Sequence, residues 1–437
     1  MDRKLDRRRF VQITGAAGLG ALAGCLGDDE PAAENGDENG MENGDESENG
    51  PEEEETEEDI PDPTATDNAL IEPATLKEWQ DVGLVNLGQL DVRERVVVLR
   101  VWDTETYDDG HVPGALKWGP NEFHAARVEG LGEVAPMVPN GAQMDAVLQR
   151  SGVCPKTTIV LSGPSSLRTA RAYWTLRYWG FPRERVKVLN GGYAGYGEEY
   201  ELETGGEPDA PSATFSVQAN SELNNDDRLG IAQMIQRVDL KHEGERDDVF
   251  LDNRPDPGAT ISTATVDDPG NYNEGDSYST KFAEGGDWKD ADAIESHVFG
   301  LEGVEDGDTI VTYCGSGYRA SMGYFALDGI LGYDDVVVYD GSFSRQWAQY
   351  DGNNTEGNVP PEKWRVDVND RTDGDTGDSD LEIVVDEIPE LASAGANQIE
   401  AADAAYMAGD EMETDDGGDG GDGGGDWGCS SVATPTL

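Results

Sequence analysis

The chain has 437 residues, with 31 basic and 91 acidic side chains and a formal net charge of −60. This balance excludes ordinary nucleic-acid binding, because neutralising phosphates requires an excess of cations. The length is sufficient for two or three domains.

The acidic residues are concentrated near both ends of the chain. Residues 28–59 contain 17 acids and no base, and the last 72 residues contain 20 acids and a single base, Arg371. Such segments bury too little apolar surface to offset the entropy of ordering. They predict a disordered acidic linker over 28–70 and a disordered, Gly/Asp-rich acidic tail over 369–437, with a loose acidic helix over 381–412.

The middle of the chain is acidic as well. Residues 60–365 contain 52 acids and 25 bases, a net charge of −27, and the whole chain has only nine lysines. Repulsion on this scale destabilises a compact domain, whereas molar salt shortens the Debye length to roughly 3 Å. We interpret the surface as that of a halophilic protein, with an acidic mesophilic protein as the alternative.

The N-terminus has the pattern of an export signal. Arg7, Arg8 and Arg9 precede a short Gly/Ala-rich apolar run over 11–24, which is too short to span a bilayer. The run leads to Cys25 through small residues, which resembles the lipobox of lipoproteins exported by the twin-arginine route. We expect residues 1–27 to be this signal and Cys25 to be lipidated. The protein would then be exported and held on the outer face of the cytoplasmic membrane by the lipid alone; a buried N-terminal helix is the alternative.

Cysteine and histidine spacing predicts neither a metal site nor a disulfide framework. The cysteines Cys25, Cys154, Cys314 and Cys429 are far apart in the sequence, and the four histidines show no ligand spacing with one another or with cysteine. Cys154 directly precedes a predicted strand, where cysteine usually acts as a small buried hydrophobe.

An internal repeat organises the middle of the chain. Buried-strand patterns at 96–101, 158–161 and 186–189 recur at 249–251, 309–313 and 336–339, and a helical pattern at 168–178 recurs at 319–331. The landmark pairs Asp103/Asp252, Arg168/Arg319 and Gly191/Gly341 lie 149, 151 and 150 residues apart. Alternating strands and helices predict two α/β domains, each a parallel sheet flanked by helices. We place them at 71–205 and 226–368, joined by a linker at 206–225.

The loop after the strand at 309–313 carries the most reactive chemistry. It reads Cys314, Gly315, Ser316, Gly317, Tyr318 and Arg319, and a helix follows. Two glycines let successive backbone N–H groups converge on one point, and the helix N-terminus adds partial positive charge. This environment stabilises a thiolate at Cys314. The alternative is a buried cysteine in a Gly-rich turn.

Several motifs in this order resemble the tandem-domain rhodaneses, the thiosulfate and 3-mercaptopyruvate sulfurtransferases. In the second half they are the Cys314 loop, Asp252-Asn253-Arg254 and Tyr339-Asp340-Gly341-Ser342-Phe343 with Trp347. In the first half they are Leu99-Arg100-Val101-Trp102-Asp103, Gly110-His111-Val112-Pro113-Gly114-Ala115 and Leu189-Asn190-Gly191-Gly192-Tyr193. The resemblance covers about residues 75–365.

The resemblance implies a thiosulfate sulfurtransferase without a cofactor. Cys314 would carry the transferred sulfur as a persulfide, and the substrate-binding residues would be Gly315, Ser316, Gly317, Tyr318, Arg319 and Arg254. The corresponding loop of the first half, Ser162 to Arg168, has no cysteine, so that half would be inert. The partners would be a small sulfur donor and a small acceptor, and the protein would be a monomer.

Two other classes of function remain open. One is a catalytically idle lipoprotein that binds a sulfur oxyanion or a protein partner. The other is a phosphatase or arsenate reductase, because these enzymes also place Cys and Arg around an oxyanion. Four residues separate Cys314 from Arg319, one fewer than in Cys-dependent phosphatases, which favours a smaller nest suited to a single sulfur.

Dilution of salt tests the interpretation of the surface. Below about 0.5 M salt the unfolding temperature should fall, because the acidic side chains lose their screening. Thermal unfolding followed across a salt series measures this, and an unfolding temperature independent of salt would contradict a halophilic surface.

Overall fold

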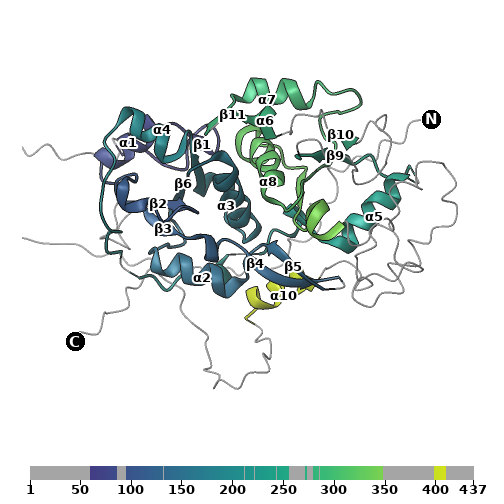
Figure 1. Ribbon diagram of the computed structural model, residues 1–437, viewed down its shortest axis with the longest axis horizontal. Helices are drawn as coiled ribbons and strands as arrows, with labels where there is room; N and C mark the ends of the chain where they lie inside the picture. Colours follow the sequence, from purple (N-terminus) through teal and green to yellow (C-terminus); the bar gives the residue numbers. More distant parts are fainter. Residues whose placement is uncertain are drawn as a thin grey trace, which may run out of the picture. The chain divides into compact units, whose positions relative to one another are not determined.

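A computed structural model describes the part of the chain that contains both halves of the repeat (Figure 1). The described residues are 60–85, 95–130, 132–210, 212–220, 222–242, 244–254, 271–272, 279–284, 286–347 and 398–409. All of them belong to one of the two units into which the chain divides, residues 57–437. The predicted signal at 1–27, including Cys25, lies outside the described residues.

The first half contains a five-stranded parallel sheet. Its strands are β1 (Leu70–Ile71), β2 (Val96–Val101), β3 (Leu116–Trp118), β6 (Thr158–Ser162) and β7 (Val186–Leu189), in the order β1-β7-β6-β2-β3. Every residue of β2, β6 and β7 is buried, as expected for a parallel sheet that is covered on both faces. An antiparallel hairpin, β4 (Ala125–Glu129) and β5 (Gly132–Met137), follows β3.

The second half repeats this topology. Its strands are β8 (Arg228–Leu229), β9 (Val249–Asp252), β10 (Asn271–Tyr272), β13 (Ile310–Tyr313) and β14 (Val336–Tyr339), in the order β10-β9-β13-β14-β8. When the strands of each half are matched in chain order, the two sheets have the same arrangement, as the internal repeat predicts. A short hairpin of β11 (Ala283–Glu284) and β12 (Asp287–Trp288) is also present.

Helices connect the strands and confirm the predicted α/β class. In the first half they are α1 (Pro73–Asp81), α2 (Gly141–Arg150), α3 (Ser166–Tyr178) and α4 (Gly192–Glu199). In the second half they are α5 (Ile231–His242), α6 (Ser279–Phe282), α7 (Ala291–Val298) and α8 (Tyr318–Tyr324), which continues into a π-helical stretch, η8 (Phe325–Leu331). Asn140 caps the N-terminus of α2, because its side chain accepts a hydrogen bond from the Gln143 amide at 2.9 Å.

The two halves pack against each other through α3 and α8, which lie side by side in Figure 1. Tyr173 of α3 packs edge-on against Phe325, with ring centroids 4.7 Å apart, and its hydroxyl donates to Asp328 at 2.6 Å. Arg177 and Arg183 of the first half also pair with Asp328, at 3.1 and 2.7 Å. One hydrophobic cluster of buried residues combines residues of both halves, so the two halves share part of their core over the described residues.

The acidic tail predicted at 369–437 contains one described helix. Residues 398–407 form a helix, α10 (Gln398–Met407), inside the range where a loose acidic helix was expected. Asp403 is buried, with its two oxygens 2.7 and 2.6 Å from the guanidinium of Arg127 and 2.8 Å from the Tyr178 hydroxyl. Composition could not show that Asp403 is compensated by Arg127, because the two residues lie 276 positions apart in the sequence.

No helix within the described ranges is both long enough and apolar enough to cross a membrane.

Candidate functional site

Cys314 lies at the carboxyl edge of the second sheet, directly after β13 and before α8. Its side chain is a free thiol, and only 1% of the residue is exposed. Ligand sites of parallel α/β sheets lie at this edge. The turn from strand to helix passes through Gly317, whose φ of 80° is a left-handed conformation that suits glycine. A Cβ at Gly317 would lie 2.7 Å from the Asp340 carbonyl oxygen and 2.9 Å from Nη1 of Arg171, so the loop is closely packed from below.

Ser342 holds this loop in place. Its hydroxyl oxygen accepts hydrogen bonds from the amides of Cys314 and Gly317, at 3.1 and 3.0 Å, and donates to the Tyr339 carbonyl at 2.8 Å. Ser342 has a φ of 53°, an uncommon conformation for a residue with a side chain. The backbone adds a further link, because the Phe343 amide donates to the Cys314 carbonyl at 2.8 Å.

The sulfur receives only part of the expected ring of amides. The Ser316 amide donates to Sγ of Cys314 at 3.4 Å, as a thiolate-stabilising nest requires. The amides of Cys314 and Gly317 point instead to Ser342, which corrects the prediction that the whole loop converges on the sulfur. The reason is geometric: the Ser342 hydrogen is committed to Tyr339, so its lone pairs face these two amides.

The other predicted site residues are not all gathered around the sulfur. Gly315 and Ser316 are partly exposed, Tyr318 is buried and Arg319 is exposed. The guanidinium of Arg254 pairs with both oxygens of Asp252, at 2.9 and 2.6 Å. This edge of the guanidinium is therefore already occupied and is not available to bind a sulfur donor.

Arg254 still lies within electrostatic reach of the sulfur. Burial disfavours its charge, but the hydrogen bonds and charge of Asp252 outweigh burial and raise the pKa of Arg254. Cys314 acts in the same direction, and the guanidinium lies 4.1 Å from the centre of the Phe343 ring.

A buried ion network supports the loop from beneath. Asp340 pairs with Arg171 of α3 at 2.8 Å and with Arg228 at 3.3 Å, and all three side chains are fully buried. Arg228 also pairs with Glu129 at 2.8 Å and lies 3.7 Å from Glu400 of α10. Burial alone would raise the pKa of Asp340, but the two arginines outweigh it and hold the pKa below its ordinary value. These charges therefore join both halves and the C-terminal helix.

A second group of residues surrounds Tyr318 on the side of the first half. The Trp102 ring lies 5.8 Å from the Tyr318 ring, edge-on, and the Tyr318 hydroxyl is 3.0 Å from Nδ1 of His124. The guanidinium of Arg168 lies 3.4 Å from the centre of the Trp102 ring. Burial lowers the pKa of His124, and the charges of Arg171 and Arg168 lower it further.

Sequence reasoning missed the functional setting of Arg171, Arg168, Trp102 and His124. Arg168 appeared only as a landmark of the repeat and in the loop without a cysteine, and Trp102 appeared only within a family motif. The sequence contained part of this information, because the repeat places both loops at the carboxyl ends of their strands. That the two ends face each other follows only from the packing of α3 against α8.

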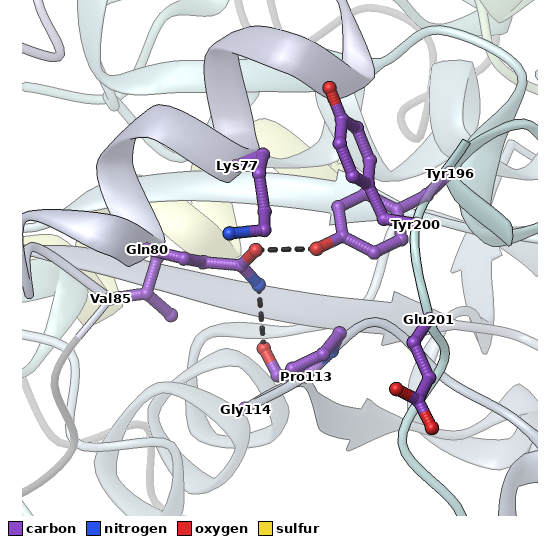
Figure 2. Close-up of a pocket in the computed structure, with 8 residues that line it drawn as sticks. All are labelled: Lys77, Gln80, Val85, Pro113, Gly114, Tyr196, Tyr200 and Glu201. Carbon is purple, nitrogen blue, oxygen red and sulfur yellow. Dashed lines mark hydrogen bonds between the residues drawn. The ribbon is translucent and has the colours of Figure 1, made fainter.

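Two pockets are formed by the first half. One, of about 420 Å³, is shown in Figure 2. Its lining residues are Lys77, Gln80, Val85, Pro113, Gly114, Tyr196, Tyr200 and Glu201. The Tyr196 hydroxyl donates to Gln80 at 2.6 Å, and Gln80 donates to the Pro113 carbonyl at 3.0 Å. These polar groups of the pocket wall therefore already have hydrogen-bond partners. The other pocket, of about 750 Å³, has Trp102 in its wall.

The described cysteines differ in state, and no metal-binding cluster occurs around them. Cys314 is free, whereas Cys154 is disulfide-bonded, which the sequence did not predict. Cys154 is also buried, as expected. Within the described ranges no group of His, Cys, Asp and Glu is arranged to hold a metal ion.

The first half matches a known domain family. Residues 72–199 match the model described as "Rhodanese-like domain". The matched range ends before Cys314.

Comparison with individual proteins relates the chain to sulfurtransferases. It is 27% identical over 282 residues to a Haloferax volcanii protein named "Putative thiosulfate sulfurtransferase", covering 63% of this chain and 93% of that protein. It is 26% identical over 262 residues to the Escherichia coli "3-mercaptopyruvate sulfurtransferase", covering 56% of this chain and 84% of that one. The crystal structure of SseA from Escherichia coli is 21% identical, with a TM-score of 0.47, covering 63% of this chain and 99% of that chain.

Replacement of Ser342 tests its role in the loop. Ser342→Ala removes the acceptor of two buried amides and should lower the free energy of unfolding by about 1–3 kcal/mol. Hydrogen exchange at Cys314 and Gly317 should accelerate with it, measured by mass spectrometry of the loop peptide. Ser344→Ala is the matched control, because Ser344 is exposed and binds Gly315 only through its backbone amide. Equal exchange in the two variants would contradict the role of Ser342.

Proposed function

We propose that the chain is a sulfurtransferase that moves sulfane sulfur from thiosulfate, or a similar donor, to a thiophilic acceptor through a persulfide on Cys314. The observation that carries this proposal is the free thiol of Cys314 at the carboxyl edge of the sheet, with the Ser316 amide directed at its sulfur. Relatedness to sulfurtransferases supports the same chemistry.

Two displacements complete the reaction. In the first, the Cys314 thiolate attacks the outer sulfur of thiosulfate; the new S–S bond forms as the old one breaks, and sulfite leaves with the electron pair. In the second, cyanide or a thiolate attacks the terminal sulfur of the persulfide, and the Cys314 thiolate is the leaving group. With cyanide the product is thiocyanate, and the total charge is conserved in each step. No cofactor enters either displacement.

The loop contributes electrostatic stabilisation. The Ser316 amide stabilises negative charge on the Cys314 sulfur, and the same donor serves the persulfide anion. Ser342 keeps the loop from relaxing while the charge moves to the outer sulfur, because it ties both ends of the turn, at Cys314 and Gly317. The Arg254–Asp252 pair is a rigid neighbour, with one guanidinium face against Phe343.

We also propose that the protein works outside the cell in a salty medium. The twin-arginine pattern and the small residues before Cys25 support export and lipidation, and the acidic composition supports a halophilic surface. Mass spectrometry of the mature N-terminus decides whether Cys25 carries lipid.

A lipoprotein that only binds a sulfur oxyanion is the second candidate function. One observation favours it: two of the three loop amides discussed above are directed at Ser342 and not at the sulfur. Such a protein would bind the anion without transferring sulfur.

Thiocyanate formation from thiosulfate and cyanide in molar salt tests the proposed function. Wild-type protein should turn over, and Cys314→Ser should fall to background because the hydroxyl cannot form a persulfide. After thiosulfate treatment without acceptor, the wild-type peptide that contains Cys314 should gain the mass of one sulfur atom.

The matched control is Ser344→Ala, which should retain wild-type turnover. Equal inactivity of wild type and Cys314→Ser, with no added sulfur on the peptide, would overturn the proposal and leave binding as the remaining activity.

A further inference from the structure

Two arginines converge on Tyr318, the residue that opens α8, and a third follows it in the sequence. The Arg168 guanidinium lies 4.6 Å from the centre of the Tyr318 ring, and that of Arg171 lies 5.3 Å from it. Arg319 is the next residue along the helix and is exposed. Arg168 and Arg171 come from the half without the free cysteine, so the cysteine loop faces cations that its own half does not supply.

The charges in this group are not balanced. Within the described ranges Arg168 forms no ion pair with a carboxylate, and Arg171 pairs only with Asp340, which it shares with Arg228. Arg319 lies close enough to disfavour the charge of Arg168: burial is the main cause that lowers the pKa of Arg168, Tyr318 opposes this, and Arg319 adds to the lowering. In a chain with a net charge of −60, Arg168 and Arg319 are two cations beside the candidate site that form no ion pair with a described carboxylate.

Aromatic rings fix the orientation of Arg168. Its guanidinium lies 3.4 Å from the centre of the Trp102 ring, a stacking distance. Trp102 has a φ of 77°, an uncommon backbone conformation for a residue with a bulky side chain. A stacked guanidinium has its faces covered and its N–H edge available, and this edge matches two oxygens of an oxyanion.

There is open space next to this ring. Trp102 lines the pocket of about 750 Å³, together with Asp103, Glu105 and Glu122. Asp103 is paired with Arg100 and Glu122 with Arg150, and Glu105 is exposed. Arg168 stacks on a residue of this pocket wall, Trp102, and forms no ion pair with a described carboxylate.

We propose that Arg168 binds the oxyanion end of the sulfur donor. This inference rests on the proposed function and adds a residue of the first half to the binding site for the donor's sulfonate-like group. The half without the free cysteine thus takes part in selecting the substrate. Cyanide and other acceptors that lack such a group do not need Arg168.

Titration calorimetry on the Cys314→Ser background tests this inference, with thiosulfate and sulfite as probes. This background separates binding from transfer. Arg168→Gln should weaken binding of both anions at least 10-fold. The affinity of Arg168→Lys should lie between those of the parent and of Arg168→Gln, because an ammonium keeps the charge but loses the planar edge. The matched control is Arg185→Gln, at the amino end of β7, where Arg185 binds the Lys156 carbonyl; it should bind as its parent does.

Turnover of otherwise wild-type protein gives a second measurement. Arg168→Gln should raise the KM for thiosulfate at least 10-fold and leave the reaction of the persulfide with cyanide unchanged. Arg168 is partly exposed, so an unchanged unfolding temperature is expected and is checked alongside. If Arg168→Gln does not fold, Arg168→Lys is compared with Arg185→Gln instead.

The outcomes separate this inference from the proposed function. Equal binding and equal KM in Arg168→Gln and Arg185→Gln would overturn the role of Arg168 and leave sulfur transfer untouched. Anion binding that depends on Arg168, in a wild-type protein without turnover, would support the subsite and overturn sulfur transfer.

Discussion

The buried charge of Asp340 is the constraint on which the site depends. Its carboxylate is shared by Arg171 of the first half and Arg228 of the second, and it also accepts a hydrogen bond from the Val138 amide at 2.9 Å. Breaking a buried pair by removing one partner costs about 3–5 kcal/mol, because the other charge stays buried without compensation. Ser342 follows Asp340 by two residues, so the group that holds the Cys314 loop is anchored to the network that joins the two halves.

In this arrangement the two halves of the repeat have different roles. Both halves have the same sheet topology, but only the second has a free cysteine at the end of its central strand. The first half reaches across with Arg171 and Arg168, and α10 reaches the same network from the other side through Glu400. The acidic C-terminal region is therefore part of the folded protein at α10, and its helix joins the ion pairs behind the Cys314 loop.

The sequence predicted the parts of the structure that depend on local pattern. Continuous apolar runs located β2 and β7, and the Gly-rich turn after β13 identified Cys314. Long-range pairing could not be predicted. Nothing near Asp403 indicates that Arg127, 276 residues away, neutralises it. The direction of the loop amides depended on where Ser342 comes to lie, about 28 residues later in the chain.

The coupling of Arg171 to the Cys314 loop is the central claim, and a double-mutant cycle on the rate of persulfide formation measures it most directly. Arg171→Met and Asp340→Asn should each slow the transfer of sulfur from thiosulfate to Cys314 by about 10-fold or more. The double variant should be no slower than the slower single one, because both changes break the same pair. Rates that multiply in the double variant, or single variants that react like wild type, would contradict the account.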